Sequence, residues 1–294
     1  MPRARIEALL AIVASLLVAA AVSWAGSRGG ARVQGVPVFV LCAALAFGIN
    51  WIAFVPAWLG RSEKFYDLTG SLTYLATAAF AFAAGGVRDA RAWLLLTLVS
   101  IWAMRLGWFL FGRIRADGSD RRFDALKRDA LRFLMAWTLQ GLWVLLTLAC
   151  ALAALTAAGP ARPGPLAVAG TLVWIGGFAV EAVADRQKRA FRRDDANRGR
   201  FISHGLWSWS RHPNYFGEIV LWCGVALIAL PTLAGWRYVT LISPLFVFLL
   251  LTRVSGVPML EQHAEATWGD DPEYRDYKAR TPVLLLRPPR RADS

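Results

Sequence analysis

Residues 132–157 read RFLMAWTLQGLWVLLTLACALAALTA, and the only charged side chain among them is Arg132, at the first position. A helix that crosses a bilayer needs about 20 predominantly apolar residues. This run is therefore long enough to span a membrane, and it sets the fold class if similar runs flank it.

Similar apolar runs occur on both sides of this stretch. We expect membrane-spanning helices at about 6–24, 37–59, 68–86, 92–111, 132–157, 165–184, 214–233 and 238–256. The chain is 56% hydrophobic and 18% charged, whereas soluble domains carry about 25% charged residues. The sequence therefore predicts an all-α, polytopic integral membrane protein. It excludes a soluble enzyme, a disordered chain and a coiled coil.

The first apolar run allows two interpretations. Arg3 and Arg5 precede it, as in a signal peptide, but the run is long and ends in a weak cleavage site, Ala-Val-Ser-Trp-Ala-Gly. We favour a retained helix, which gives about eight transmembrane helices, with seven possible if the run is cleaved.

The basic residues predict the orientation. Of the 33 Lys and Arg residues, 26 fall on alternate segments that include both ends of the chain, six fall on the other loops, and Arg105 lies within a helix. Because cytoplasmic loops are rich in Lys and Arg, both termini are expected in the cytoplasm. This distribution accounts for most of the net charge of +13 without a nucleic-acid partner, and we expect none.

Several kinds of site lack support in the sequence. Cys42, Cys150 and Cys223 lie in apolar runs, and the three histidines show no HxxH or HExxH spacing, so no metal site is expected. Neither GxGxxG nor GxxxxGK[ST] occurs, which excludes a Rossmann turn and a P-loop. The outer loops are short and poor in functional groups, so the chemistry is expected within the helices or on the cytoplasmic side.

Four ionisable residues mark the end of the sixth predicted helix. Their spacings of four, three and four place them on one helical face: Glu181, Asp185, Lys188 and Arg192. One interpretation is a solvated stripe of ion pairs at the membrane surface. The other is a wall that meets a phosphate-bearing ligand.

The segment that follows combines cations, aromatic rings and amides. Arg198, Arg200 and Arg211 are interspersed with Trp207, Trp209 and Tyr215, beside Asn197 and His204. Guanidinium groups bind phosphate in bidentate fashion, and aromatic faces stack on bases. Pro213 fits the first turn of the next helix, so Asn214 and Glu218 share one face near a helix N-terminus that favours an anion. We therefore favour a nucleotide-type cofactor over an anionic lipid headgroup.

One string in this segment resembles a known family. Ser210–Glu218, SRHPNYFGE, is similar to the signature of the steroid 5α-reductase C-terminal family. Its superfamily also contains the sterol C14/C7 reductases and the isoprenylcysteine carboxyl methyltransferases. The strings 65–74 (FYDLTGSLTY), 105–107 (RLG) and 269–282 (GDDPEYRDYKARTP) resemble the bacterial branch, described only as a domain of unknown function. The similarity covers about residues 60–285.

The resemblance implies NADPH, held from the cytoplasmic side. Asp185 matches an acidic residue of the family, Asn214 and Glu218 match residues that hold the nicotinamide amide, and arginines would bind the phosphates. The resulting candidate cofactor set is Asp185, Lys188, Arg192, Asn197, Arg200, His204, Leu206, Trp207, Arg211, His212, Asn214, Tyr215, Glu218, Arg253 and Glu261.

At the substrate end, the sequence departs from the steroid reductases. Tyr66-Asp67-Leu68 stands where they have Gln-Glu-Leu on the substrate carbonyl, and Trp102 stands where they have a tyrosine, three residues before Arg105. We therefore expect Tyr66, Asp67 and Tyr74 to polarise the substrate carbonyl. Interfacial packing remains the other interpretation of the two tyrosines, and Arg105 could extend to the membrane surface.

These features lead to one function and one alternative. We expect a membrane-embedded, NADPH-dependent reductase of a C=C bond conjugated to a carbonyl, acting on a steroid, sterol or other enone lipid. The alternative is an S-adenosylmethionine-dependent membrane methyltransferase of the isoprenylcysteine carboxyl methyltransferase type. A transporter is not favoured, because no inverted repeat is evident.

We further expect residues 1–60 to add two N-terminal helices to a catalytic domain at 61–294. The expected location is the bacterial inner membrane, with the cofactor site facing the cytoplasm. The expected partners are the lipophilic substrate and membrane lipids, with no obligate protein partner.

Overall fold

The structure is a computed structural model that describes residues 3–117, 123–161 and 163–289. Across these ranges the secondary structure is helical apart from one short hairpin. Eight helices in the described part of the chain are long and apolar enough to cross a membrane. The protein is thus an all-α, polytopic membrane protein, as the apolar runs predict.

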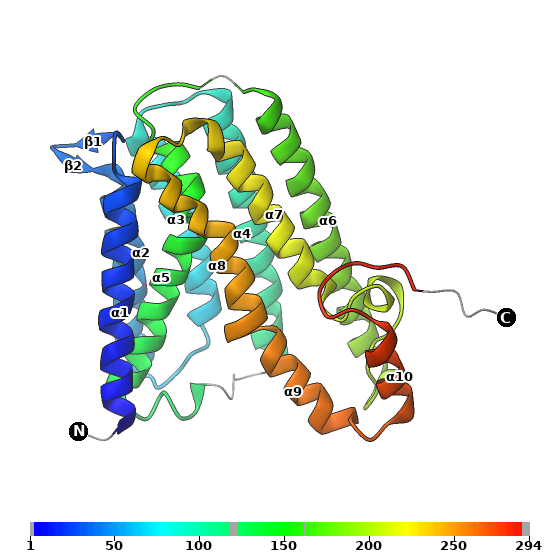
Figure 1. The fold of residues 1–294 in the computed structure, drawn as a ribbon. Helices are drawn as coiled ribbons and strands as arrows, with labels where there is room; N and C mark the ends of the chain where they lie inside the picture. The colour runs from blue at the N-terminus through cyan, green and yellow to red at the C-terminus, as the bar shows by residue number, and fades with distance from the viewer. Residues whose placement is uncertain (1–2, 118–122, 162, 290–294) are drawn as a thin grey trace. The chain divides into compact units, whose positions relative to one another are not determined.

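The chain forms two compact units. Figure 1 labels most of their helices and strands. Unit 1 comprises Met1–Val168 and Ala226–Ser243, and unit 2 comprises Ala169–Val225 and Pro244–Ser294. The division expected at residue 60 stays a prediction.

Unit 1 is built around one central helix. Its elements are α1 (Arg3–Gly26), β1 (Arg32–Val33), β2 (Val36–Pro37), α2 (Val38–Leu59), α3 (Tyr66–Gly85), α4 (Ala90–Asp117), α5 (Ala130–Leu155), η4 (Leu230–Thr232) and η5 (Gly235–Leu241). Helices α1, α2 and α3 pack against α5, and 83% of the residues in the apolar stretch of α5 are buried. Small residues along α5 allow this close packing: a Cβ atom on Gly141 would lie only 3.0 Å from the Phe47 ring.

The loops of unit 1 meet at one end, which we call the loop end; it comprises residues 27–37, 86–89, 156–164 without residue 162, and 230–240. The backbone N–H of Ala31 donates to the Thr156 carbonyl at 2.8 Å, and the Asp89 carboxylate accepts from the Ala161 N–H at 2.9 Å. Asp89 also pairs with the buried guanidinium of Arg91 at 3.3 Å. These long-range contacts fix the helix ends relative to one another.

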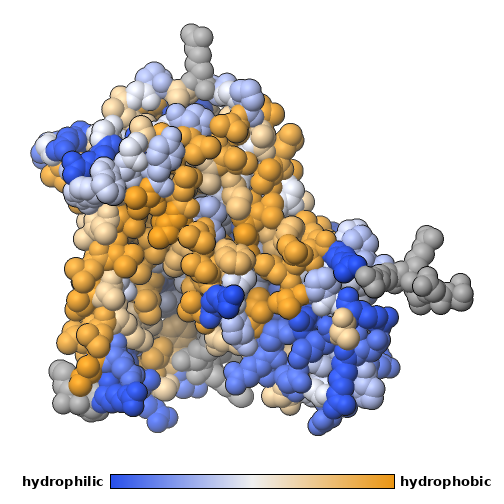
Figure 2. Space-filling model, viewed as in Figure 1, coloured by the Kyte–Doolittle hydropathy of each residue, from blue (hydrophilic) through white to orange (hydrophobic). Residues whose placement is uncertain are grey.

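Unit 2 carries most of the remaining helices. Its elements are α6 (Pro165–Arg193, beginning in unit 1), η2 (Asp195–Asn197), η3 (Gly205–Ser208), α7 (Pro213–Ala229, ending in unit 1), α8 (Ile242–Leu249, beginning in unit 1), the π-helical segment η6 (Leu250–Val254), α9 (Val257–Trp268) and α10 (Pro272–Arg280). Figure 2 shows apolar side chains along α8 and hydrophilic ones over α9 and α10.

A seam of glycines joins α6 to α7 in unit 2. A Cβ atom on Gly217 would lie 2.5 Å from the Gly177 carbonyl oxygen, and one on Gly224 would lie 2.6 Å from the Gly170 carbonyl oxygen. The two backbones are therefore in direct contact at two places seven residues apart. Small residues permit this approach between membrane helices.

The predicted helices are confirmed in order and position, with two differences. Helix α6 continues nine residues beyond the expected end at 184, because its charged last turns extend past the apolar run. The eighth run, expected at 238–256, combines η5, α8 and the π-helical η6 instead of forming one regular helix. Helices α9 and α10 and the β1–β2 hairpin are not predicted from the sequence, because they are too short or too polar to give the signal of a membrane-spanning helix.

Candidate functional site

The charged face of α6 forms one side of the candidate site in unit 2. Glu181 and Asp185 are only 3% and 7% exposed, whereas Arg192 lies exposed in the last turn. The ammonium group of Lys188 lies 4.6 Å from the centre of the Trp207 ring, a cation–π distance. The predicted helical face is thus present, and its charge goes from buried carboxylates to exposed cations along the helix.

Trp207 anchors the loop between α6 and α7. Its indole N–H donates to the Ala184 carbonyl at 3.1 Å, and its own carbonyl accepts from the Tyr277 hydroxyl at 2.7 Å. The N–H of Leu206 donates to the Gln187 side chain at 3.0 Å. The loop is therefore held on α6 on one side and on α10 on the other.

Glu261 joins the loop to α9. Its two carboxylate oxygens contact the guanidinium of Arg211 and Nε2 of His212, the latter at 2.8 Å. The His212 ring stacks on Tyr215 with centroids 5.6 Å apart. Glu261 thus contacts two other predicted site residues, Arg211 and His212, and His212 contacts a third, Tyr215.

The C-terminal segment fixes the residues before α7. The N–H of Arg211 donates to the Pro282 carbonyl at 2.9 Å, and the Ser210 hydroxyl donates to the Leu284 carbonyl at 2.9 Å. Pro213 begins α7, as predicted, because its fixed φ suits a first helical turn. Asn214 and Glu218, four residues apart and partly buried, therefore project from the same face of the first turns.

An aromatic cluster that the sequence analysis did not single out supports the loop. Phe201 contacts Tyr274 and Tyr277 with ring centroids 5.2 and 5.4 Å apart, and Trp268 at 6.0 Å. The signal that could have found it is the concentration of aromatic residues in the tail, Trp268, Tyr274 and Tyr277. Sequence reasoning also missed Gln187, which accepts from the loop backbone beside the charged stripe of α6.

The remaining cofactor candidates lie outside this contact network, in the first part of the α6–α7 loop or in η6. Asn197 donates its amide N–H to the Phe191 carbonyl at 3.1 Å and so caps the end of α6. His204 and Arg200 are exposed, with the His204 ring 5.7 Å from that of Phe191. Arg253 is exposed in η6.

The substrate candidates Tyr66, Asp67 and Tyr74 lie on α3 in unit 1. The Tyr66 hydroxyl donates to the Ala136 carbonyl at 2.9 Å, and its ring packs on Phe123 and Trp137. Tyr74 is buried edge-on against Trp102, with centroids 4.9 Å apart. Asp67 is half-buried in the first turn of the helix.

Two buried polar atoms in unit 2 are available to a ligand. Within the part of the chain that the structure describes, Nε of Arg211 and Nδ1 of His212 are buried without a hydrogen-bond partner. Buried polar groups in native proteins are normally satisfied, so these atoms are candidates for ligand contact. No three His, Cys, Asp or Glu side chains among the described residues are grouped as metal ligands would be.

Burial lowers the pKa of His212 below its ordinary value; the charges of Lys188 and Arg211 act in the same direction, while Glu261 opposes them. Below a pH of about 6.5, the ordinary pKa of histidine, the unfolded chain binds a proton that the folded chain resists. Above that pH, His212 therefore does not reduce the stability of the fold. As the pH drops toward the lowered pKa, the free energy of unfolding decreases.

We expect this pH dependence to weaken in a His212→Gln variant, whose amide can still donate to Glu261. Thermal unfolding of the detergent-purified protein at pH 7.5 and pH 5.5 measures the effect. The wild type should lose more stability on acidification than the variant, whereas His263→Gln, a change at an exposed histidine on α9, should behave as the wild type. Equal acid sensitivity of all three proteins would contradict the assignment.

A family model described as "Protein of unknown function (DUF1295)" matches residues 53–281. The chain belongs to the DUF1295 family. The match covers α3 to α10 and includes both the loop between α6 and α7 and the three substrate candidates on α3. No solved structure matches the chain.

This DUF1295 chain is also distantly similar to two kinds of enzyme. It is 27% identical over 156 residues, 53% of the chain and 48% of the relative, to "Probable O-methyltransferase ustE" of Ustilaginoidea virens. It is 30% identical over 74 residues to "3-oxo-5-alpha-steroid 4-dehydrogenase 1" of Bos taurus, covering 25% of the chain and 28% of the relative. The protein of that name from Rattus norvegicus is 28% identical over 122 residues, 41% of each chain. The chain thus spans less than half the length of these relatives.

Proposed function

We propose that this protein is a membrane-embedded reductase that uses NADPH to reduce a C=C bond conjugated to a carbonyl group in a steroid-like or other lipophilic molecule. The observation that carries the proposal is the cluster in unit 2. In this cluster, Lys188 of α6 contacts the Trp207 ring. Arg211 and His212, directly before α7, both contact Glu261 of α9. Cations, buried polar atoms and aromatic rings together suit a ligand with phosphate groups and flat rings.

The residues of the cluster fit the parts of such a cofactor. We assign the cations of α6 and the loop, Lys188, Arg192 and Arg200, to phosphate groups. The carboxylate of Glu261 balances the charge of Arg211. We therefore assign Arg211 to positioning the cofactor as well as to attracting its phosphates. Asn214 and Glu218, which share one face at the start of α7, are assigned to an amide group.

NADPH, when bound, supplies the hydride. We assign Tyr66 and Asp67 to the substrate carbonyl: the Tyr66 hydroxyl donates a hydrogen bond that stabilises the developing enolate, and the Asp67 carboxylate orients that donor. The Tyr66 hydroxyl must give up its hydrogen bond to Ala136 before it can donate elsewhere. Tyr74, packed against Trp102, lies two turns further along α3 and is the second phenol assigned to the substrate.

The similarity to two proteins named 3-oxo-5-alpha-steroid 4-dehydrogenase 1 supports a reductase. A methyltransferase that uses S-adenosylmethionine is the second candidate. It is favoured by the longer alignment with the probable O-methyltransferase and by Glu261, which balances one of the charges that phosphates would need. The other cations of α6 and the loop favour the dinucleotide, because NADPH carries three phosphate groups.

The distribution of Lys and Arg supports a cofactor site that faces the cytoplasm, and we propose the bacterial inner membrane as the location. The proposed partners are a lipophilic enone and membrane lipids. Neither a nucleic acid nor an obligate protein partner is part of the proposal.

Thermal-shift titration of the purified protein with NADPH, NADH and S-adenosylmethionine tests the cofactor class. We expect NADPH to stabilise the protein more than NADH does, and S-adenosylmethionine to have no effect. Lys188→Gln should weaken the NADPH response, whereas Arg186→Gln, a change at an exposed cation two residues earlier on α6, should not. A response to S-adenosylmethionine alone would overturn the reductase in favour of the methyltransferase.

We expect Asp67→Asn to lower turnover of an enone substrate about a hundredfold, because it removes the charge that orients the carbonyl donors. Stabilisation by NADPH should remain unchanged. Enone-dependent NADPH oxidation measures turnover, and Asp270→Asn, on the exposed surface of unit 2, is the control. Unchanged turnover in Asp67→Asn would remove Asp67 from the mechanism.

A further inference from the structure

A groove between α1 and α2 lies outside the candidate site and outside the residues that the family model matches. It encloses about 840 Å³ and is lined by residues 16–51 of unit 1. The groove exists because α1 and α2 both pack mainly against α5 and contact each other little. Small residues such as Ala19, Ala20, Ala44 and Gly48 leave the space between them open.

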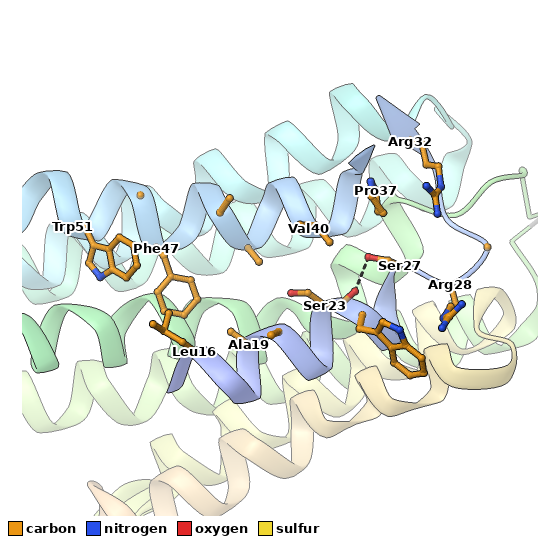
Figure 3. A pocket seen from close by; sticks show the side chains of 16 residues that line it. Leu16, Ala19, Ser23, Ser27, Arg28, Arg32, Pro37, Val40, Phe47 and Trp51 are labelled. Carbon is orange, nitrogen blue, oxygen red and sulfur yellow. Dashed lines mark hydrogen bonds between the residues drawn. The ribbon is translucent and has the colours of Figure 1, made fainter. Parts of the chain in front are cut away.

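The groove is apolar along its length and basic at one end. Leu16, Phe47 and Trp51 line the apolar part, and Arg28 and Arg32 line the end formed by the turn after α1 and by the hairpin (Figure 3). From Leu16 to the end of α1 at Gly26 the helix rises about 15 Å, the thickness of one leaflet of a hydrocarbon core about 30 Å thick. The groove therefore has the length and polarity of a lipid with one acyl chain inserted.

Aromatic residues place the basic end at the level of the lipid headgroups. Trp24 and Trp236 are exposed and contact each other edge-on at 5.2 Å, and Arg28 lies 4.2 Å from the Trp24 ring centre. Exposed tryptophans collect at the boundary between hydrocarbon and headgroups. Arg28 and Arg32 thus lie at the depth where a phosphate is found.

The charges at the loop end favour an anion. In the sequence of the four loop-end segments, Asp89 is the only acidic residue, and its carboxylate is taken up by Arg91 and by the N–H groups of Ala92 and Ala161. Arg32 uses one N–H on the Gly35 carbonyl at 2.9 Å, and Arg28 faces an aromatic ring rather than a carboxylate. Both guanidinium groups keep N–H donors that a phosphate can accept from.

We propose that this groove binds a membrane phospholipid with an anionic headgroup, its acyl chain between α1 and α2 and its phosphate at Arg28 and Arg32. The inference is independent of the proposed reductase activity. It depends on geometry and charge in unit 1 alone.

Native mass spectrometry and thermal shift of the full chain in detergent test the proposal. The probes are phosphatidylglycerol and phosphatidylcholine with the same acyl chains. We expect phosphatidylglycerol to bind about tenfold more tightly, and Arg28→Gln combined with Arg32→Gln to remove most of that preference. Arg88→Gln, which changes an exposed arginine of the loop end that does not line the groove, should leave the preference intact.

A second pair of variants tests the apolar part. Ala20→Phe fills the groove and should reduce retention of both lipids, whereas Ala14→Phe, at an exposed position of α1 outside the lining, should not. Equal affinity for the two lipids in the wild type would overturn the proposal. So would a preference that survives the double arginine change, or equal losses in Ala20→Phe and Ala14→Phe.

Discussion

Gly177→Ala is expected to destabilise the protein by about 2–3 kcal/mol, whereas Gly176→Ala, one residue earlier, should be neutral or stabilising. A Cβ atom added to Gly177 would lie 2.5 Å from the Leu221 backbone nitrogen and 2.6 Å from the Gly217 carbonyl oxygen. Since both are main-chain atoms of α7, only a displacement of the whole helix can relieve the clash. At Gly176 no described atom outside the neighbouring backbone of α6 lies within 4 Å of the added methyl group.

The same change should weaken ligand binding, because the glycine seam positions both sides of the candidate site. Glu181 and Asp185 follow Gly177 on α6, and Asn214 and Glu218 flank Gly217 on α7. Thermal unfolding in detergent, with and without NADPH, measures both effects. The Gly176→Ala protein is the matched control, since it makes the same chemical change in the same helix. Equal stability of the two variants would show that the close approach is not needed.

Glu261→Gln is expected to lower stability by about 1–3 kcal/mol, because it leaves the guanidinium of Arg211 without its carboxylate in a partly buried position. The same variant removes the charge that faces His212. Glu265→Gln, four residues further along α9, breaks an exposed pair with Lys278 and should cost no more than about 0.5 kcal/mol.

A double-mutant cycle separates the interaction energy of the Arg211–Glu261 pair from the other effects of each substitution. Arg211→Gln and Glu261→Gln together should destabilise by less than the sum of the single changes, because the double variant leaves no unbalanced charge. Chemical or thermal unfolding of the four proteins gives the coupling energy. Additive effects would mean that the contact contributes nothing to stability.

The helices could be predicted from the sequence because their signal is local. A run such as 132–157 must form a helix in lipid, because its backbone N–H and C=O groups need hydrogen-bond partners there. Its length alone shows that it can span the membrane. Pro213 marked the start of α7 for the same reason, since proline restricts its own backbone. The i, i+4 spacing of Asp185 and its neighbours likewise predicted one helical face.

Contacts between distant residues could not be predicted in this way. Glu261 lies 50 residues from Arg211, and nothing in its own neighbourhood, Met-Leu-Glu-Gln-His, indicates which cation it meets. Gly177 resembles any small residue of a membrane helix in the sequence, and only the structure shows the Gly217 carbonyl oxygen 2.6 Å from its added Cβ position. The α1–α2 groove exists because α1 and α2 both pack mainly against α5 and contact each other little. The apolar runs in the sequence do not indicate which helices pack together.

The sequence by itself determined that this chain is a helical membrane protein of the DUF1295 family, where its helices lie and where its polar residues gather. Hydrophobic length and helical periodicity are properties of neighbouring residues, so they can be read along the chain. Only the tertiary structure decided that Glu261 binds Arg211 and His212, that α6 and α7 meet backbone to backbone, and that a basic-ended groove separates α1 from α2. Those features arise from packing between helices, where the shape and charge of residues far apart in sequence must fit together.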